Sequence, residues 1–273
     1  MGCVKLATPT TLANGIYMPT IFTVAAALLG AAVGSFLNVV IYRLPLGLSI
    51  VSPPSSCPRC DTRISALQNI PVVSYILLRG RCAKCREPIS IRYPLVEALT
   101  SVLTALLWLR FGEDPLLFGI YFIFMAAMVA VVFIDIDHKI IPDSISLGGI
   151  VLGFAASFFT PVGWVDSLIG IVAGAGSLFL VAWGYHIITG KEGMGMGDVK
   201  LLGAIGAFLG WQSVLFTIFV SSVTGSVVGV VALKLMGEGR DYEIPYGPFI
   251  VLGALAYLFR GPELIDWYLS LMG

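Results

Sequence analysis

The chain has 273 residues, of which 58% are hydrophobic and only 12% are charged, and its formal net charge is zero. Soluble globular domains carry about 25% charged residues, so a chain with half that share lacks the polar surface to cover a water-soluble core of this size. The apolar residues come in long blocks, and blocks of about 20 residues cross a bilayer as a helix. This composition excludes an ordinary soluble domain and favours a membrane protein, while the balanced charge gives no indication of a nucleic-acid partner.

Eight apolar blocks follow one another along the chain, and we expect each to form a helix in the bilayer. They are residues 19–42, 94–110, 115–134, 144–160, 166–188, 199–210, 213–234 and 246–260. The first block lacks the cleavage pattern of a signal peptide, and the sixth is short for a full crossing. The chain is therefore predicted to be an all-α polytopic membrane protein with about eight transmembrane helices, although seven or nine spans fit the sequence too.

A polar segment between the first two blocks is large enough to fold outside the membrane. We expect three parts: an N-terminal segment with the first helix (1–42), this polar segment (43–93) and a membrane-embedded bundle (94–273). The polar segment carries eight Lys or Arg residues against two acids, and short basic loops stay in the cytoplasm. The sequence therefore predicts a cytoplasmic polar segment and an N-terminus outside. With eight spans, 13 of the 16 basic residues then lie on the cytoplasmic side.

The polar segment contains two CxxC pairs, Cys57-Pro-Arg-Cys60 and Cys82-Ala-Lys-Cys85, with 21 residues between them. Each tight turn directs two thiolates at one metal ion, and two such turns complete the tetrahedral coordination of zinc. A cytoplasmic location disfavours disulfides. We predict a zinc-ribbon-like structural site with no open position for catalysis; a redox pair or unrelated cysteines are the alternatives. The fifth cysteine, Cys3, is given no role.

Acidic side chains are costly at membrane depth, so they indicate function there. Asp135 follows an unbroken apolar run at the cytoplasmic end of the third block, and Asp198 follows three glycines at the start of the sixth. The predicted topology places both acids on one side of the bilayer. Two carboxyl groups that meet in a partly dry site share a proton, and together they supply the acid and the base that peptide hydrolysis needs.

Two neighbouring acids have simpler interpretations. Asp137 is two positions from Asp135, so the two point to roughly opposite faces of a helix, and only one of them is expected to face Asp198. The residues alone do not choose between them. Asp137 and Asp143 are interpreted as charges at helix ends, and Asp143 suits the N-cap of the following helix.

Two other functions fit the same acids. A membrane transferase would use Asp135, Asp137 and Asp198 as Mg²⁺ ligands for a prenyl or phosphorylated substrate. An ion-coupled transporter would use the aspartates as a proton relay near the bilayer midplane, whereas the sequence places them near the cytoplasmic edge.

Several motifs keep a fixed order along the chain. They are GSFLNVVIYRLP at residues 34–45, the two cysteine pairs, RYPLVE at 92–97, the run from Asp135 to Asp143, and GKEGMGMGDVK at 190–200. Together they resemble the bacterial type IV prepilin peptidases, a family of GxGD-type aspartyl proteases. The resemblance covers roughly residues 25–235.

This resemblance implies roles for particular residues. In the family's pattern the first catalytic aspartate opens the D-x5-I-P run, which is Asp135 here, and the second closes the GxGD motif, which is Asp198. It implies an inner-membrane enzyme that removes a short basic leader, just after a glycine, from type IV prepilins or type II secretion pseudopilins. It also implies N-methylation of the new N-terminus with S-adenosylmethionine. Glu97 and the loop arginines are candidates for that activity and equally for structural charges, so it is assigned no site.

Overall fold

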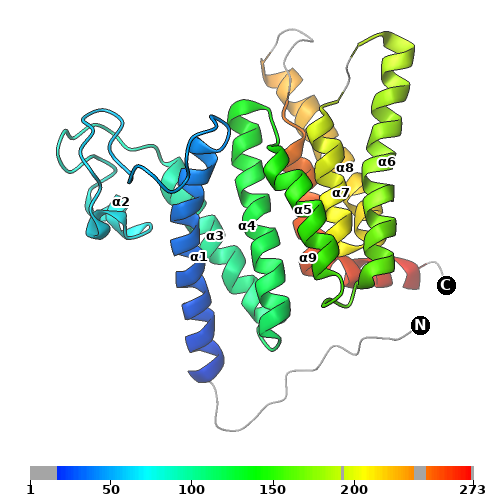
Figure 1. Cartoon of the computed structure of the whole chain (residues 1–273), viewed down its shortest axis with the longest axis horizontal. Coiled ribbons are helices and arrows are strands. Elements are labelled where there is room, and N and C mark those ends of the chain that lie inside the picture. Colours follow the sequence, from blue (N-terminus) through cyan, green and yellow to red (C-terminus); the bar gives the residue numbers. More distant parts are fainter. Residues whose placement is uncertain (1–16, 192–193, 237–243, 272–273) are drawn as a thin grey trace.

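Figure 1 shows the computed structural model of the chain, in which residues 17–191, 194–236 and 244–271 are described. These residues form α-helices and one 3₁₀ helix, and none of them forms a β-strand. The elements are α1 (Tyr17–Arg43), η1 (Ala66–Asn69), α2 (Val73–Leu77), α3 (Arg92–Phe111), α4 (Pro115–His138), α5 (Asp143–Ala156), α6 (Gly163–Thr189), α7 (Met196–Leu209), α8 (Trp211–Met236) and α9 (Gly247–Ser270). The predicted all-α fold is confirmed. Cys3 lies outside the described residues.

The helices α1 and α3 to α9 coincide with the eight predicted apolar blocks. Six of them, α1, α3, α4, α6, α8 and α9, are long and apolar enough to cross a bilayer. α5 and α7 have 14 residues each, which makes them about 21 Å long, whereas the hydrocarbon core is about 30 Å thick. The sequence correctly predicted that the sixth block, which forms α7, is short for a full crossing. It predicted the fourth block, which forms α5, too long, because the apolar run continues past the end of α5 at Ala156.

The helices alternate in direction, so their connections lie at two opposite ends of the bundle (Figure 1). One end carries the segment between α1 and α3, the turn between α4 and α5, and the connection between α6 and α7. The α3–α4, α5–α6 and α7–α8 connections lie at the other end. We refer to residues 44–91 as the cysteine segment and to its side of the bundle as the cysteine end.

Some helices run further than the apolar pattern predicts. α4 continues from residue 134 to His138, and α9 continues from residue 260 to Ser270. An apolar run stops at the first polar residue, whereas a helix stops where its backbone geometry changes. In α4 the change comes at Lys139, whose φ is 53° and whose N–H donates to the Asp135 carbonyl over 2.9 Å.

The predicted N-cap of α5 was wrong by one residue. Pro142 occupies the cap, because its ψ of 134° is non-helical, and Asp143 is the first helical residue. An N-cap side chain would bind the backbone of its own helix. The Asp143 carboxyl group is not the cap, so it can reach a partner on another helix.

The short helix α7 is enclosed by its neighbours. Residues 201–210 are all buried. α5 and α6 approach it through glycines: a Cβ on Gly174 would lie 2.5 Å from the Leu202 carbonyl oxygen, and one on Gly153 would lie 2.8 Å from the Ala207 Cβ. Small residues permit the close backbone contact by which helices associate in membranes. This packing fixes the position of the first turn of α7.

The cysteine segment lies beside α1 and α3 rather than over the centre of the bundle (Figure 1). These two helices pack closely, since a Cβ on Gly34 would lie 2.8 Å from the Glu97 Cα. The Asn38 side-chain amide also donates to the Tyr93 carbonyl over 3.1 Å. The division of the chain at residues 42 and 93 stays a prediction.

Candidate active site

Asp135 lies in the last turn of α4 and is buried, with 5% of its surface exposed. The preceding Ile134 is completely buried, so the acid follows directly on the apolar part of the helix. The backbone N–H of Gly247, the first residue of α9, donates a hydrogen bond to Asp135 Oδ2 over 2.9 Å. α9 therefore holds a carboxylate oxygen that belongs to α4.

Asp198 is the third residue of α7, and it is half-buried. A Cβ on the preceding Gly197 would lie 3.0 Å from the Ile141 Cβ, and a Cβ on Gly247 would lie 3.4 Å from the Ile141 Cδ1. Ile141 thus contacts both the glycine beside Asp198 and the glycine that binds Asp135. The two carboxyl groups are close enough for their charges to repel each other. The structure brings together the two acids that the sequence singled out.

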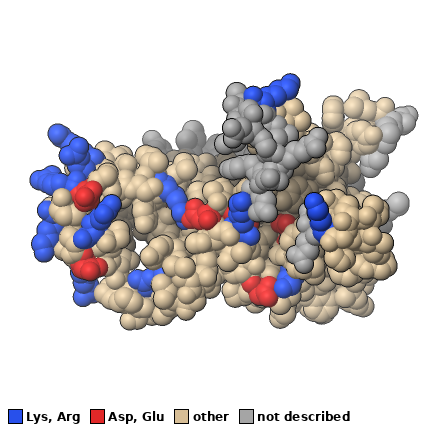
Figure 2. Space-filling model, turned by 90° about the horizontal axis from the view of Figure 1, so that it is seen from above, with Lys and Arg blue, Asp and Glu red and all other residues tan. Residues whose placement is uncertain are grey.

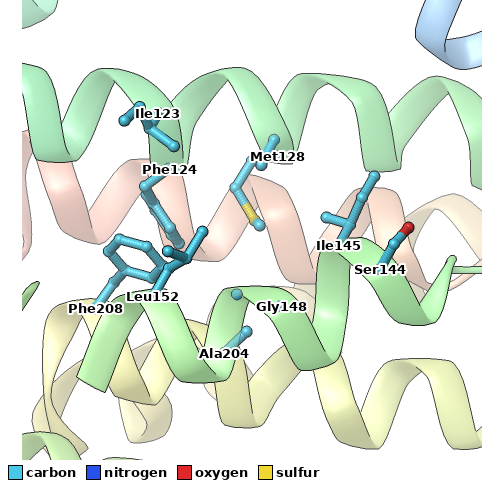
Figure 3. Close-up of a pocket in the computed structure, with 11 residues that line it drawn as sticks. Ile123, Phe124, Met128, Ser144, Ile145, Gly148, Leu152, Ala204 and Phe208 are labelled. Atoms are coloured by element: carbon cyan, nitrogen blue, oxygen red, sulfur yellow. The ribbon is translucent and has the colours of Figure 1, made fainter. Parts of the chain in front are cut away.

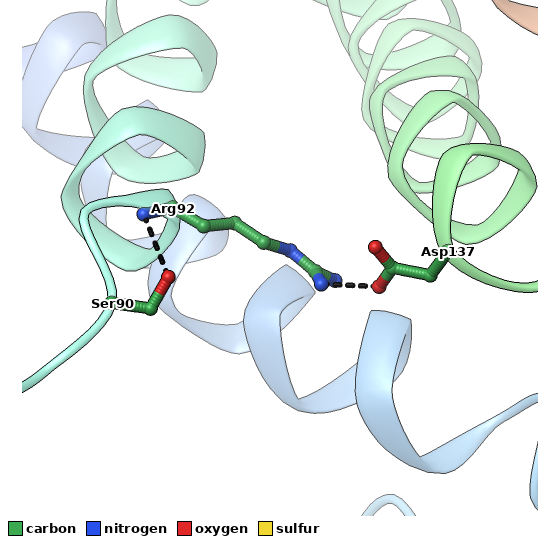
Figure 4. A network of polar contacts seen from close by, with 3 residues as sticks. All are labelled: Ser90, Arg92 and Asp137. Carbon is green, nitrogen blue, oxygen red and sulfur yellow. Dashed lines mark hydrogen bonds and ion pairs between the residues drawn. The ribbon is translucent and has the colours of Figure 1, made fainter.

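The other two acids at this end form ion pairs. Asp137 pairs with Arg92 at the start of α3, and the Ser90 hydroxyl accepts a hydrogen bond from the Arg92 N–H over 3.3 Å (Figure 4). Asp143 accepts from Lys200 Nζ of α7 over 2.7 Å. Both lie near helix ends, as expected, but each has a specific partner that the sequence did not indicate.

Two carboxyl groups that meet in a partly buried site do not ionise together easily, so such a pair can hold one proton between its members. The ionised carboxylate then accepts a proton from water, and the protonated one donates to a carbonyl oxygen. The α4–α7 arrangement supplies this pair from helices that are far apart in the sequence.

The four predicted metal ligands, Cys57, Cys60, Cys82 and Cys85, form one cluster in which their Sγ atoms all lie within 4.8 Å of one another. The Sγ atoms of Cys57 and Cys85 are 3.8 Å apart. A tetrahedral zinc with Zn–S bonds of about 2.3 Å separates its sulfurs by about 3.8 Å. Hydrogen bonding with Thr62 lowers the pKa of Cys60 to about 6, which favours the metal-binding thiolate. These residues fit a metal ion with four thiolate ligands.

Both CxxC pairs have the same local structure. The N–H of Cys57 donates to the Thr62 carbonyl over 3.0 Å, and the N–H of Cys82 donates to the Glu87 carbonyl over 2.8 Å. An antiparallel bridge closes each loop. The residues with positive φ that end the two turns are Asp61 at 51° and Arg86 at 60°. Two equivalent turns facing one point are the arrangement expected of a four-thiolate metal site.

An apolar groove of about 180 Å³ lies between α4, α5 and α7 (Figure 3). Its lining includes Phe124, Met128, Leu152, Ala204 and Phe208. α4 and α7 also carry Asp135 and Asp198, and the groove residues lie about two turns or more along these helices from the acids. The groove therefore lies farther along the bundle than the two acids, toward the membrane interior.

Three contributors to the site were not predicted. Gly247 acts through backbone position, which no local motif marks, and Ile141 acts through packing, a role that its place in the D-x5-I-P run did not indicate. Arg92 was counted among the loop charges and opens the RYPLVE motif, but neither observation indicated a partner for it. The structure places it at the first position of α3, at the cysteine end, within reach of a helix-end acid.

Fold and site together define a class of protein, a multi-pass membrane protein in which two acids from separate helices meet at one end of the bundle, beside a four-thiol cluster. Residues 28–111 match the bacterial peptidase A24 N-terminal domain, and residues 122–230 match the type IV leader peptidase family. The chain belongs to the type IV leader peptidase family, and it is also similar along nearly its whole length to the relatives of that kind described next.

Relatives with the name prepilin leader peptidase/N-methyltransferase are similar along nearly the whole chain. The Legionella pneumophila protein is 37% identical over 93% of this chain and 97% of its own length. The Pseudomonas aeruginosa protein is 38% identical over 93% and 96%, and the Neisseria gonorrhoeae protein is 38% identical over 90% and 94%. No solved structure matches the chain.

Proposed function

We propose that this chain cleaves the leader of type IV prepilins or pseudopilins with Asp135 and Asp198 as its catalytic pair, and that it N-methylates the new N-terminus. The observation that carries the peptidase proposal is the meeting of these two acids, one buried and one half-buried, at a single end of the bundle. The name of the relatives, prepilin leader peptidase/N-methyltransferase, supports both activities and the substrate class.

In the proposed reaction, water attacks the carbonyl carbon of the scissile peptide bond. The ionised carboxyl group takes a proton from that water, and the protonated one donates its proton to the carbonyl oxygen. Collapse of the tetrahedral intermediate then breaks the C–N bond: one carboxyl group protonates the leaving amine, and a hydroxyl group of the intermediate returns its proton to the other, which restores the singly protonated pair. The Gly247 N–H holds Oδ2 of Asp135 in place through these steps.

We further propose that the cysteine end faces the cytoplasm of a bacterial inner membrane and that the N-terminus lies outside. The excess of Lys and Arg in the cysteine segment supports this orientation. α4 ends and α7 begins at the same end of the bundle as that segment (Figure 1). Asp135 lies in the last turn of α4 and Asp198 in the first turn of α7, so leader cleavage would occur at the cytoplasmic face.

The metal we propose for the four cysteines is zinc, in a structural role. Zinc bound there would stabilise the fold of the cysteine segment, since four thiolates leave no position for a substrate. Methyl transfer would use S-adenosylmethionine as the methyl donor. We assign no residue to its binding, so this half of the proposal rests on the names of the relatives.

The two other functions considered from the sequence have less support. A Mg²⁺ transferase would gather Asp135, Asp137 and Asp198 around one ion. Among the described residues, the four cysteines are the only group of three or more candidate ligands close enough to share a metal. Asp137 instead pairs with Arg92. The names of the relatives do not indicate transport.

Co-expression with a prepilin tests the proposal. Asp135→Asn and Asp198→Asn should each leave the precursor uncut, and mass spectrometry of the wild-type product should show the mature chain with one added methyl group. Glu113→Gln is the matched control, because Glu113 is exposed and lies in the α3–α4 connection at the opposite end of the bundle, and its product should be wild type. Mature pilin from either mutant of the pair would reject the assigned dyad. Activity that persists in EDTA would exclude a Mg²⁺ mechanism.

A further inference from the structure

The short helix α2 presents an apolar strip to the outside of the protein. Val73, Ile76 and Leu77 share one helix face by their spacing, and Ile70 precedes them. Between 43% and 76% of the surface of each of these four residues is exposed. Apolar side chains grouped in this way mark contact with a membrane or another protein.

A buried acid fixes the depth of this strip. Oε2 of Glu97 accepts a hydrogen bond from the Val72 N–H, at the start of α2, over 2.7 Å. Glu97 lies about 7 Å along α3 from its beginning at Arg92, and only 9% of its surface is exposed. α2 therefore starts beside the second turn of a helix that is long and apolar enough to cross a bilayer.

The Val72 backbone supports the importance of this contact. Its φ of 61° lies in the left-handed region, which is unfavourable for a β-branched side chain. The hydrogen bond to Glu97 compensates for that conformation and holds α2 at one orientation relative to α3. The exposed strip is thus a fixed surface beside the bundle rather than the tip of a loose loop.

The surroundings of the strip are basic. Residues 44–91 contain six Lys or Arg residues and two acids, and Arg79 and Arg81 come just after α2. Figure 2, which looks onto the cysteine end, shows basic side chains gathered at one side of the molecule. Apolar side chains next to arginines match a layer of anionic headgroups over acyl chains, and the same charge disfavours a basic peptide as the occupant.

We propose that residues 70–77 dock into the headgroup–acyl boundary of the leaflet at the cysteine end. Val73, Ile76 and Leu77 enter the acyl layer, and Arg79 and Arg81 contact the phosphates of anionic lipids. Docking gives the cysteine segment a third attachment to the membrane besides α1 and α3. The proposal does not depend on the catalytic role of the aspartates.

Hydrogen exchange of the full-length protein tests this docking. Single copies are placed in nanodiscs of phosphatidylcholine with phosphatidylglycerol, and exchange of residues 73–78 is followed by mass spectrometry. These amides should exchange about tenfold more slowly in the wild type than in an Ile76→Ser/Leu77→Ser variant. Arg79→Glu/Arg81→Glu should lose the difference between these discs and discs of phosphatidylcholine alone.

Val51→Ser is the matched control, because Val51 is 85% exposed in the same segment but outside the strip, and its exchange should be wild type. An unchanged metal content shows that each variant keeps the fold of the cysteine segment. Equal exchange in the wild type and the Ile76→Ser/Leu77→Ser variant would overturn the proposal. Protection that requires two copies per disc, or an added prepilin, would overturn it as well, since the occupant would then be a protein.

Discussion

The Gly247 N–H binds Oδ2 of Asp135, and the space between these two residues admits no side chain. A Cβ at position 247 would lie 2.7 Å from that oxygen and 3.2 Å from the Asp135 Cγ. A substitution here must therefore move either the carboxyl group or the start of α9. The contact joins two helices whose positions in the chain are far apart, and it fixes one member of the proposed catalytic pair.

Gly247→Ala is expected to lower the rate of prepilin cleavage about 100-fold, because a small displacement of a catalytic group has effects of that size. The rate is measured with purified protein in micelles, and the amount of protein in the membrane fraction should be unchanged. Gly119→Ala is the control, because a Cβ on Gly119 in α4 would meet nothing within 4 Å. Wild-type cleavage by Gly247→Ala would show that Asp135 does not depend on this hydrogen bond.

The Arg92–Asp137 ion pair is expected to support activity more than stability. Its side chains are 32% and 29% exposed, and ion pairs near the surface contribute only about 0–1 kcal/mol. The pair nevertheless joins the start of α3 to the turn of α4 that carries Asp135. Arg92→Glu should therefore lower kcat for prepilin cleavage about tenfold, with a melting temperature close to wild type.

Charge reversal separates this positioning role from a general loss of charge. The double variant Arg92→Glu/Asp137→Arg should recover most of the activity, since it restores the pair in the opposite sense. Arg110→Glu is the comparison, because it disrupts the Arg110–Glu263 pair at the other end of α3 and should leave kcat unchanged. If the double variant is as slow as the single one, the ion pair does not position Asp135.

The sequence located the helices because the length of an apolar block is itself the physical requirement for crossing a bilayer. It could not fix their ends. α4 runs four residues past its apolar run, and this extension carries Asp135 and Asp137 on one helix. The short helix α2 escaped prediction, because five residues give no periodic pattern to detect.

The choice between Asp135 and Asp137 shows what a local sequence pattern cannot predict. Periodicity predicts that the two lie on opposite faces, but it does not say which face meets α7. Tertiary packing decides: Asp135 is buried against the Gly247 backbone, whereas Asp137 turns to Arg92. The cysteine cluster was predictable residue by residue, because metal ligands must be close together and CxxC spacing already brings two of them into one turn.

The α6–α7 interface predicts a stability defect. A Cβ on Gly206 would collide with the backbone of Gly170, and a Cβ on Gly170 would collide with that of Gly206. Gly206→Ala must push the two helices apart, and overpacking of this kind costs about 1–3 kcal/mol. The thermal midpoint in micelles should fall, whereas Gly176→Ala in α6, where a Cβ meets nothing within 4 Å, should keep it. Equal midpoints would mean that α6 and α7 are not in close contact.

Loss of one thiolate should unfold the cysteine segment without affecting the bundle. The segment is small and polar, so it lacks the hydrophobic core that would hold it together without metal. Cys60→Ser is expected to reduce the zinc content from about one ion per chain to near zero, as measured by mass spectrometry of the metal. The six Lys and Arg residues of the segment then become sites for trypsin.

Limited proteolysis distinguishes a structural metal from an incidental one. Trypsin should cut Cys60→Ser between α1 and α3 and leave a membrane-embedded fragment that starts near α3, because α4 to α9 pack independently of the thiols. Cys3→Ser, a change in the one cysteine outside the cluster, should keep both the zinc and the resistance to trypsin. If Cys60→Ser loses its zinc yet resists trypsin as the wild type does, contacts such as Val72 with Glu97 hold the segment together and the metal does not.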